Sequence, residues 1–127
     1  DIAINREPNV GQYYNSKGSI LARIGRFDES FAAFAKAIEL EPNNALFLES
    51  LGFAYVDLGN KLNEDATYLD NTAYAKAKVE IDAAYKNALP YFEKAYELEP
   101  DNESFKHSLR SLYYRLGMND KYEALAD

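Results

Sequence analysis

Apolar residues recur every three or four positions along most of this chain, which is the spacing that places them on one face of an α-helix. Such stripes run through residues 11–24, 28–40, 48–58, 72–98 and 105–116. No segment shows the alternation of apolar and polar residues that a half-buried strand requires. The pattern therefore predicts an all-α protein.

Glycine and proline predict where these helices end. Gly25, Gly59 and Gly117 each follow an apolar stripe, and glycine readily takes the left-handed conformation that closes a helix. Pro42 cannot continue the helix before it. The helices that follow are expected to start at residues whose side chains can cap a free N–H group, namely Asn43-Asn44 and Asp101-Asn102.

The chain repeats itself at a fixed spacing. Residues 37–44 (AIELEPNN) match residues 95–102 (AYELEPDN), 58 positions later, and residues 3–9 match residues 37–43, 34 positions later. Gly18 and Gly52 are also 34 apart. The period is therefore 34 residues, and because 58 exceeds 34 by 24, residues at about 60–83 are an insertion.

A helical pair of 34 residues with these side chains resembles the tetratricopeptide repeat. The middle unit carries most of the positions of that pattern: Leu48, Leu51, Gly52, Tyr55, Ala88, Phe92, Ala95 and Pro100. The first unit matches at Tyr14, Gly18, Leu21, Ser30, Phe34, Ala37 and Pro42. Lys17 departs from the pattern in the first unit and Arg110 in the third, where it replaces a small residue.

The resemblance implies antiparallel helix pairs stacked as a right-handed superhelix, an α-solenoid. Residues 1–9 would be the tail of a preceding repeat, 10–43 the first repeat, and 44–101 the second repeat with its insertion. Residues 102–127 would be a partial third repeat or a C-terminal cap. Because the chain starts inside a helix and without Met, we expect a segment of a longer array.

The insertion is expected to contain a loop over residues 60–71, followed by one long helix from Thr72 to Leu98. Two interpretations stay open. The insertion is a tolerated extension at a loop tip whose apolar residues fold back on the helix, or it forms a second contact surface. The residues concerned are Leu62, Tyr68, Leu69 and Tyr74.

Composition narrows the chemistry. The chain of 127 residues has no Cys and one His, so disulfides and thiolate metal sites are excluded. Its formal net charge of −7 argues against binding to nucleic acid or to an anionic membrane surface, and no apolar run is long enough to span a membrane. We find no catalytic constellation, and we expect no enzyme activity, no cofactor and no metal ion.

In proteins similar to this one, the first helices of successive repeats line a concave groove. Carried over by repeat offset, the groove residues here are Gln12, Asn15, Ser19, Arg23, Glu49, Phe53, Val56, Asp57, His107, Ser111, Tyr114 and Arg115. The alternative is that Phe53 and Tyr114 pack against a neighbouring repeat. Some family members hold the C-terminal carboxylate of a chaperone with cations, but those offsets here carry Asn15, Ser19, Ser50, Ser104 and Ser108, which disfavours that partner.

The resemblance therefore implies a non-catalytic protein–protein interaction module, a scaffold that binds a peptide or helix of a partner protein. The alternative is a structural or accessory segment of a longer protein, attached to an enzyme or to a secreted or periplasmic assembly. Self-association through exposed terminal helices is a further expectation. The compartment is open, cytoplasmic or, after removal of a signal peptide, periplasmic; the use of Asn, Lys and Tyr points to a bacterial source.

Overall fold

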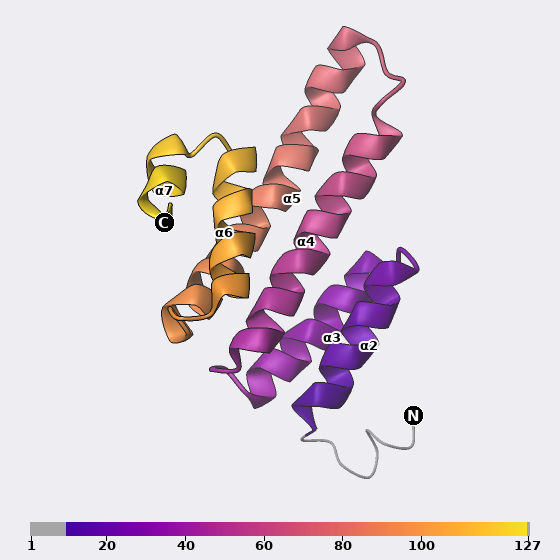
Figure 1. Cartoon of the computed structure of the whole chain (residues 1–127). Helices are drawn as coiled ribbons and strands as arrows, with labels where there is room; N and C mark the ends of the chain where they lie inside the picture. Colours follow the sequence, from indigo (N-terminus) through magenta and orange to yellow (C-terminus); the bar gives the residue numbers. More distant parts are fainter. Residues whose placement is uncertain (1–9, 127) are drawn as a thin grey trace.

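The computed structural model describes residues 10–126, and over that range it contains six α-helices and no strand. The helices are α2 (Gly11–Arg23), α3 (Phe27–Leu40), α4 (Ala45–Asp65), α5 (Asn71–Leu98), α6 (Glu103–Arg115) and α7 (Asn119–Ala124). They form three pairs placed side by side: α2 with α3, α4 with α5, and α6 with the short α7 (Figure 1). The all-α prediction is confirmed. The expected tail of a preceding repeat, residues 1–9, lies outside the described range.

The helix ends follow the local signals in the sequence. The Asn44 side chain accepts a hydrogen bond from the Phe47 N–H group at 3.2 Å, and Asn102 caps α6 in the same way. Gly25 and Gly117 take positive φ angles of 83° and 71° directly after α2 and α6. A residue with a Cβ is strained in that conformation, so glycine allows the chain to reverse there.

Gly59 does not end a helix, which corrects the sequence-based prediction. It lies inside α4 and is buried, and a Cβ atom added to it would lie 2.7 Å from the Tyr85 ring of α5. This glycine therefore serves the close approach of two helices rather than a turn.

The loop predicted over residues 60–71 is wrong over its first half, because α4 continues to Asp65. Lys61 pairs with Asp65 one turn later at 3.1 Å, and Leu62 packs half-buried against the core. The connection to α5 is confined to residues 66–70. The extended second helix is confirmed, since α5 runs from Asn71 to Leu98. Together, the connected ends of α4 and α5 project beyond the neighbouring helices (Figure 1).

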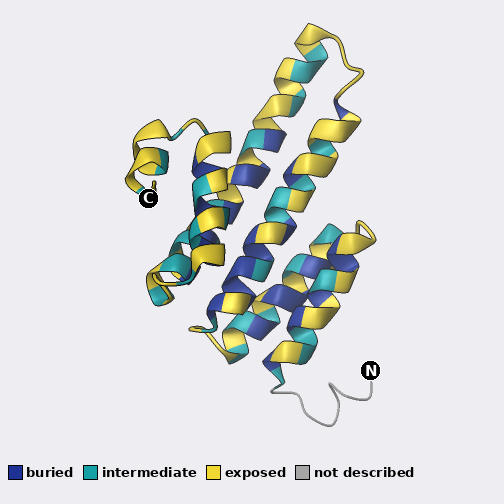
Figure 2. Ribbon diagram, viewed as in Figure 1, coloured by how far each residue is buried: buried dark blue, intermediate teal, exposed yellow. Residues whose placement is uncertain are grey.

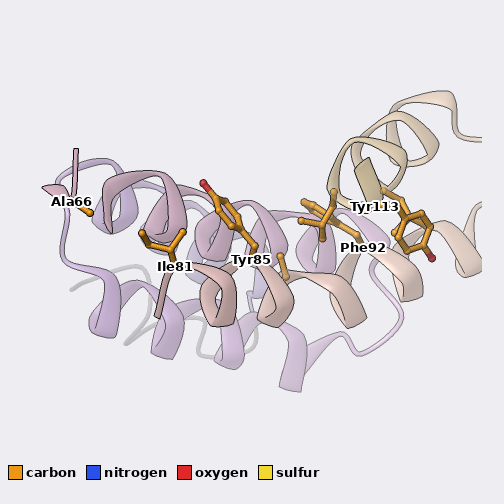
Figure 3. Packing of buried hydrophobic residues seen from close by; sticks show 8 residues of the cluster. Ala66, Ile81, Tyr85, Phe92 and Tyr113 are labelled. Carbon is orange, nitrogen blue, oxygen red and sulfur yellow. The ribbon is translucent and has the colours of Figure 1, made fainter. Parts of the chain in front are cut away.

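The core is concentrated where the three pairs meet, and exposed residues dominate the projecting ends of α4 and α5 (Figure 2). Its largest cluster follows α5, from Ala66 and Ile81 through Tyr85 to Phe92 and Tyr113 (Figure 3). Small residues opposite large ones allow this packing. Gly52 faces Phe92 and Gly18 faces Phe34, and a Cβ atom at Gly52 would lie 2.5 Å from the Phe92 ring.

The third pair is built differently from the first. In the first pair, the hydroxyl of Ser30 on α3 donates to the carbonyl oxygen of Gly18 on α2 at 2.7 Å, so the two helices touch closely. In the third pair, Arg110 stands at the position of that glycine and Tyr122 at the position of that serine. The Arg110 guanidinium lies over the Tyr122 ring, 4.1 Å from its centroid. Two large side chains therefore separate α6 from α7.

Candidate functional site

The predicted groove residues fall mainly into two separate hollows. The first, which we call the α2–α4 hollow, has a volume of about 270 Å³ and is lined by Ser19, Arg23, Phe34, Ser50, Phe53, Ala54 and Asp57. The second, the α6–α7 hollow, has a volume of about 480 Å³ and is lined by His107, Arg110, Ser111, Tyr114, Arg115 and Tyr122. The structure thus brings together four predicted residues in each hollow.

The α2–α4 hollow combines an aromatic ring with two opposite charges. Phe53 is 43% exposed, and its ring meets the ring of buried Phe92 edge to face, with 5.1 Å between centroids. That contact fixes the exposed ring in place before any ligand arrives. Arg23 and Asp57 enter from opposite helices, and burial raises the pKa of the Asp57 carboxyl. The hollow can therefore contact apolar and polar groups of a ligand at once.

Two predicted groove residues are buried between the repeats and line neither hollow. Glu49 is 8% exposed, and its Oε2 accepts a hydrogen bond from the Ser108 hydroxyl at 3.1 Å, which joins α4 to α6. Burial raises the pKa of this carboxyl, and the hydrogen bond from Ser108 lowers it by less. The geometry gives Glu49 the role of a link between repeats.

Asn15 is the equivalent of Glu49 in the first repeat, since the two are 34 residues apart, and Ser50 is the equivalent of Ser108. Ser50, however, donates its hydroxyl to the Leu46 carbonyl oxygen at 2.9 Å. The buried Oδ1 of Asn15 consequently has no hydrogen-bond partner among the described residues. A buried acceptor without a donor is costly, so this junction is less well satisfied than the next one.

The other two predicted groove residues also lie outside the hollows. Gln12 is exposed, and its Nε2 donates to the Ser16 hydroxyl at 3.2 Å. Val56 is half-buried and packs against the main core cluster.

The α6–α7 hollow is cationic and aromatic. Arg110 donates its Nε–H to the Tyr122 carbonyl oxygen at 3.4 Å, and Tyr114 lies with its ring centroid 5.4 Å from that of Tyr122. Arg115 donates from Nη1 to the Tyr85 hydroxyl at 3.2 Å, and its guanidinium lies 4.7 Å from the centroid of that ring. No acidic side chain is among the lining residues.

Sequence reasoning missed Arg110 and Tyr122 as members of this hollow. The signal that could have found Arg110 was visible, because it breaks the repeat pattern at a position that otherwise carries glycine. Tyr122 follows from the same offset, as it stands where the other two repeats have Ser30 and Ala88.

The four residues singled out in the insertion divide into two kinds. Leu62 is half-buried against the core, and the Tyr74 hydroxyl donates to the Asn63 side-chain oxygen at 3.2 Å, so both hold α4 and α5 together. Tyr68 and Leu69 stand at the tip and are 96% and 45% exposed. The extension is thus a braced helical arm with an apolar tip.

Within residues 10–126, no group of three or more His, Asp or Glu side chains is placed to hold a metal ion. Over the same residues, no helix combines the length and the apolar character needed to cross a bilayer.

Two family models match the chain. One, described as "TPR repeat", matches residues 18–59, and the other, "Tetratricopeptide repeat", matches residues 83–102. Neither match includes the extension from residue 60 to residue 82. No curated protein sequence matches the chain at significant similarity.

Two solved structures illustrate the likeness of the fold. A monomeric mutant of IFIT1 with Gppp-AAAA superposes with a TM-score of 0.76 at 20% identity, over 88% of this chain and 24% of that chain. The chain therefore spans about a quarter of the length of that relative, and the likeness identifies the fold as a helical-repeat solenoid. The first TPR of Spaghetti (RPAP3), bound to the HSP90 peptide SRMEEVD, has a TM-score of 0.36 at 24% identity, over 84% of this chain and 93% of that chain.

Proposed function

This chain is a tetratricopeptide repeat protein, and we propose that the face formed by the first helices of its repeats binds a peptide or helix of a partner protein. Tetratricopeptide repeats mediate protein–protein interactions, and the family is typically a non-catalytic interaction module. We assign residues 10–43, 44–101 and 102–127 to three repeats, the second with the insertion and the last partial. Stacked repeats of this kind present extended concave surfaces.

The α2–α4 hollow is the observation that carries this proposal. It lies between the first helices of two successive repeats, which is where a ligand of the concave face would contact both. Phe53 offers a ring already held by Phe92, so little side-chain entropy is lost when a partner covers it. Exposed aromatic anchors of this type supply much of the affinity in protein interfaces.

The test is a selection of random 12-residue peptides on the wild-type chain, followed by affinity measurements on variants. Ser50→Arg fills the α2–α4 hollow with a long side chain, and Phe53→Ala removes the anchor. We expect Phe53→Ala to weaken the selected peptides about 30-fold, the effect of losing an interface contact of about 2 kcal/mol. Ala35→Arg is the matched control, since Ala35 is exposed on α3 and lines no hollow.

Selected peptides that bind Ser50→Arg and Phe53→Ala as tightly as the wild type would refute the proposal. A selection that yields no saturable binder would refute it as well. Peptides that lose binding to both variants and keep it with Ala35→Arg would support it.

A second function, as a structural segment of a longer array, is favoured by the outer face of the first pair. Ile20 and Ile24 are 56% and 60% exposed there, and beside them Tyr13 and Leu21 line a hollow of about 300 Å³. An apolar face of this kind suits packing against another helical pair, in the same array or in a second copy. Sedimentation velocity tests the second case: association that rises with concentration and is abolished by Ile20→Lys would support it, and a monomer at all concentrations would exclude self-association through this face.

A further inference from the structure

We propose that the α6–α7 hollow binds oxyanion side chains of a peptide partner, carboxylate or phosphate, and so sets the charge of the segment that lies at this end of the protein. The inference deepens the proposed function and rests on it in one respect, namely that the ligand is a peptide.

The first argument is uncompensated positive charge. Arg110 and Arg115 line the hollow with His107, and no acidic residue lines it. In the described part of the chain, neither arginine has a carboxylate oxygen within 4.0 Å, whereas Arg26 is paired with Glu29 and Lys61 with Asp65. A cation without a local partner is free to pair with an anionic group of a ligand.

The second argument is that both guanidinium groups are held in place with donors to spare. Arginine has five N–H donors. Arg110 uses its Nε–H for the Tyr122 carbonyl, and Arg115 uses Nη1 for the Tyr85 hydroxyl. The aromatic rings of these two tyrosines lie against the guanidinium planes. A planar fork that is already oriented loses little entropy when it meets a carboxylate or phosphate.

The third argument is the shape and the apolar surface of the hollow. Its volume of about 480 Å³ exceeds that of the α2–α4 hollow, and Tyr114 is 68% exposed beside it. A free anion would use only the cations, but a peptide can place an acidic side chain on them and an apolar neighbour on Tyr114. The hollow exists because Arg110 and Tyr122 replace the small residues that let the first pair close.

The net charge of −7 does not prevent this binding. At physiological salt, charges more than about 8 Å apart are largely screened in solvent. An acidic side chain in the hollow therefore responds to the nearby cations more than to acids elsewhere on the surface.

The experiment compares three labelled 12-residue peptides with one Leu and Ala framework that carries four Glu, four Gln or four phosphoserine residues. Binding to the full chain is measured by fluorescence polarisation at 50 and 200 mM NaCl. We expect the Glu or the phosphoserine peptide to bind at least about tenfold more tightly than the Gln peptide, the effect of one added hydrogen bond between charged groups. Comparison of these two peptides tells which oxyanion the hollow prefers.

Matched variants place the effect in the hollow. Ser111 is exposed and lines it, so Ser111→Glu and Ser111→Lys change its charge without removing a contact of either arginine. Each should shift the affinity for the acidic peptides about fivefold, downward for Glu and upward for Lys, as expected for a unit charge about 4 Å from the ligand's charge in water. Asn87→Glu, exposed on α5 and outside the hollow, should leave the affinity unchanged.

Two results would overturn the inference: acidic peptides that bind no better than the Gln peptide, or binding that ignores both changes at Ser111. If peptides selected on the wild type still depend on Phe53, the proposed function stands while this inference falls. If they do not, the proposed function has failed by its own test.

Discussion

Replacing Gly52 by valine tests whether the second repeat is held by the close approach of α4 and α5. A Cβ atom at this position would lie 2.5 and 2.6 Å from two ring atoms of Phe92. Normal contacts between carbon atoms are about 3.5 to 4.0 Å, so one group must move by about 1 Å. Phe92 is 3% exposed, and the ring of Phe53 lies on its edge, so the ring has little room to move.

The size of the effect follows from two opposing terms. Valine is a better helix former than glycine, which stabilises α4 by a few tenths of a kcal/mol. Overpacking of a well-filled core costs about 1 to 3 kcal/mol, and valine adds two methyl groups beyond the clashing Cβ. We therefore expect Gly52→Val to lower the free energy of unfolding by about 2 kcal/mol, or the melting temperature by about 6 to 10 °C in a chain of this size.

Chemical and thermal denaturation, followed by circular dichroism at 222 nm, measure this loss. The matched variant is Phe92→Leu, alone and combined with Gly52→Val, because it removes the ring that causes the clash. The double variant should be more stable than the sum of the single losses predicts, by about 1 to 2 kcal/mol. A valine variant as stable as the wild type, or strictly additive losses, would refute the reasoning.

Two further predictions concern groups that link the repeats. Burial raises the pKa of Glu49 above its ordinary value of 4.5, so the folded protein binds this proton more tightly than the unfolded chain. The charged carboxylate therefore costs stability above its folded pKa, and the cost disappears as the pH falls to about 4.5. Glu49→Gln, which can still accept from Ser108, should raise the melting temperature at pH 7 and lose that advantage at pH 4; a lower melting temperature at pH 7 would contradict this. The Tyr113 hydroxyl donates to Glu93 Oε2 at 2.7 Å, and its pKa is raised by burial and by that carboxylate. Tyr113→Phe should cost about 1 kcal/mol in urea denaturation, and an unchanged midpoint would show that this hydrogen bond contributes nothing.

Most of the fold could be predicted because each repeat carries its own local signals. Asn44 and Asn102 cap helices as expected, and Gly25 and Gly117 take the left-handed conformation that ends one. These interactions connect residues at most four positions apart, so the sequence displays them directly. The 34-residue spacing added the pairing of helices.

The extension could not be predicted in full because its stability depends on a partner helix. Residues 60–65 are mostly polar and resemble a loop when read alone. In the structure they need only one apolar face toward α5, which Leu62 and the buried Ala66 supply. Gly59 misled for the same reason: its cause is the Tyr85 ring, which is 26 residues away in sequence.

The candidate site was predicted in outline, by residue rather than by shape. Repeat offsets identified Phe53 and Tyr114 as surface residues on the first helices, but an offset cannot tell whether a polar side chain is covered. Asn15 and Glu49 occupy equivalent positions and are both buried, while His107, the third equivalent, is exposed. The difference depends on what lies beyond each helix, and the third has only the short α7 beside it.

The long α4–α5 pair also bears on the order in which the chain folds. Its two helices are joined by residues 66–70 alone and are tied across by the hydrogen bond from the Tyr85 hydroxyl to Asn60 at 2.6 Å. Contacts between neighbouring helices with a short connection require little loop closure, so they form early. This pair would then be a nucleus on which the other two assemble from either side. Substitutions along it would slow folding, and substitutions in α2 or α7 would mainly speed unfolding.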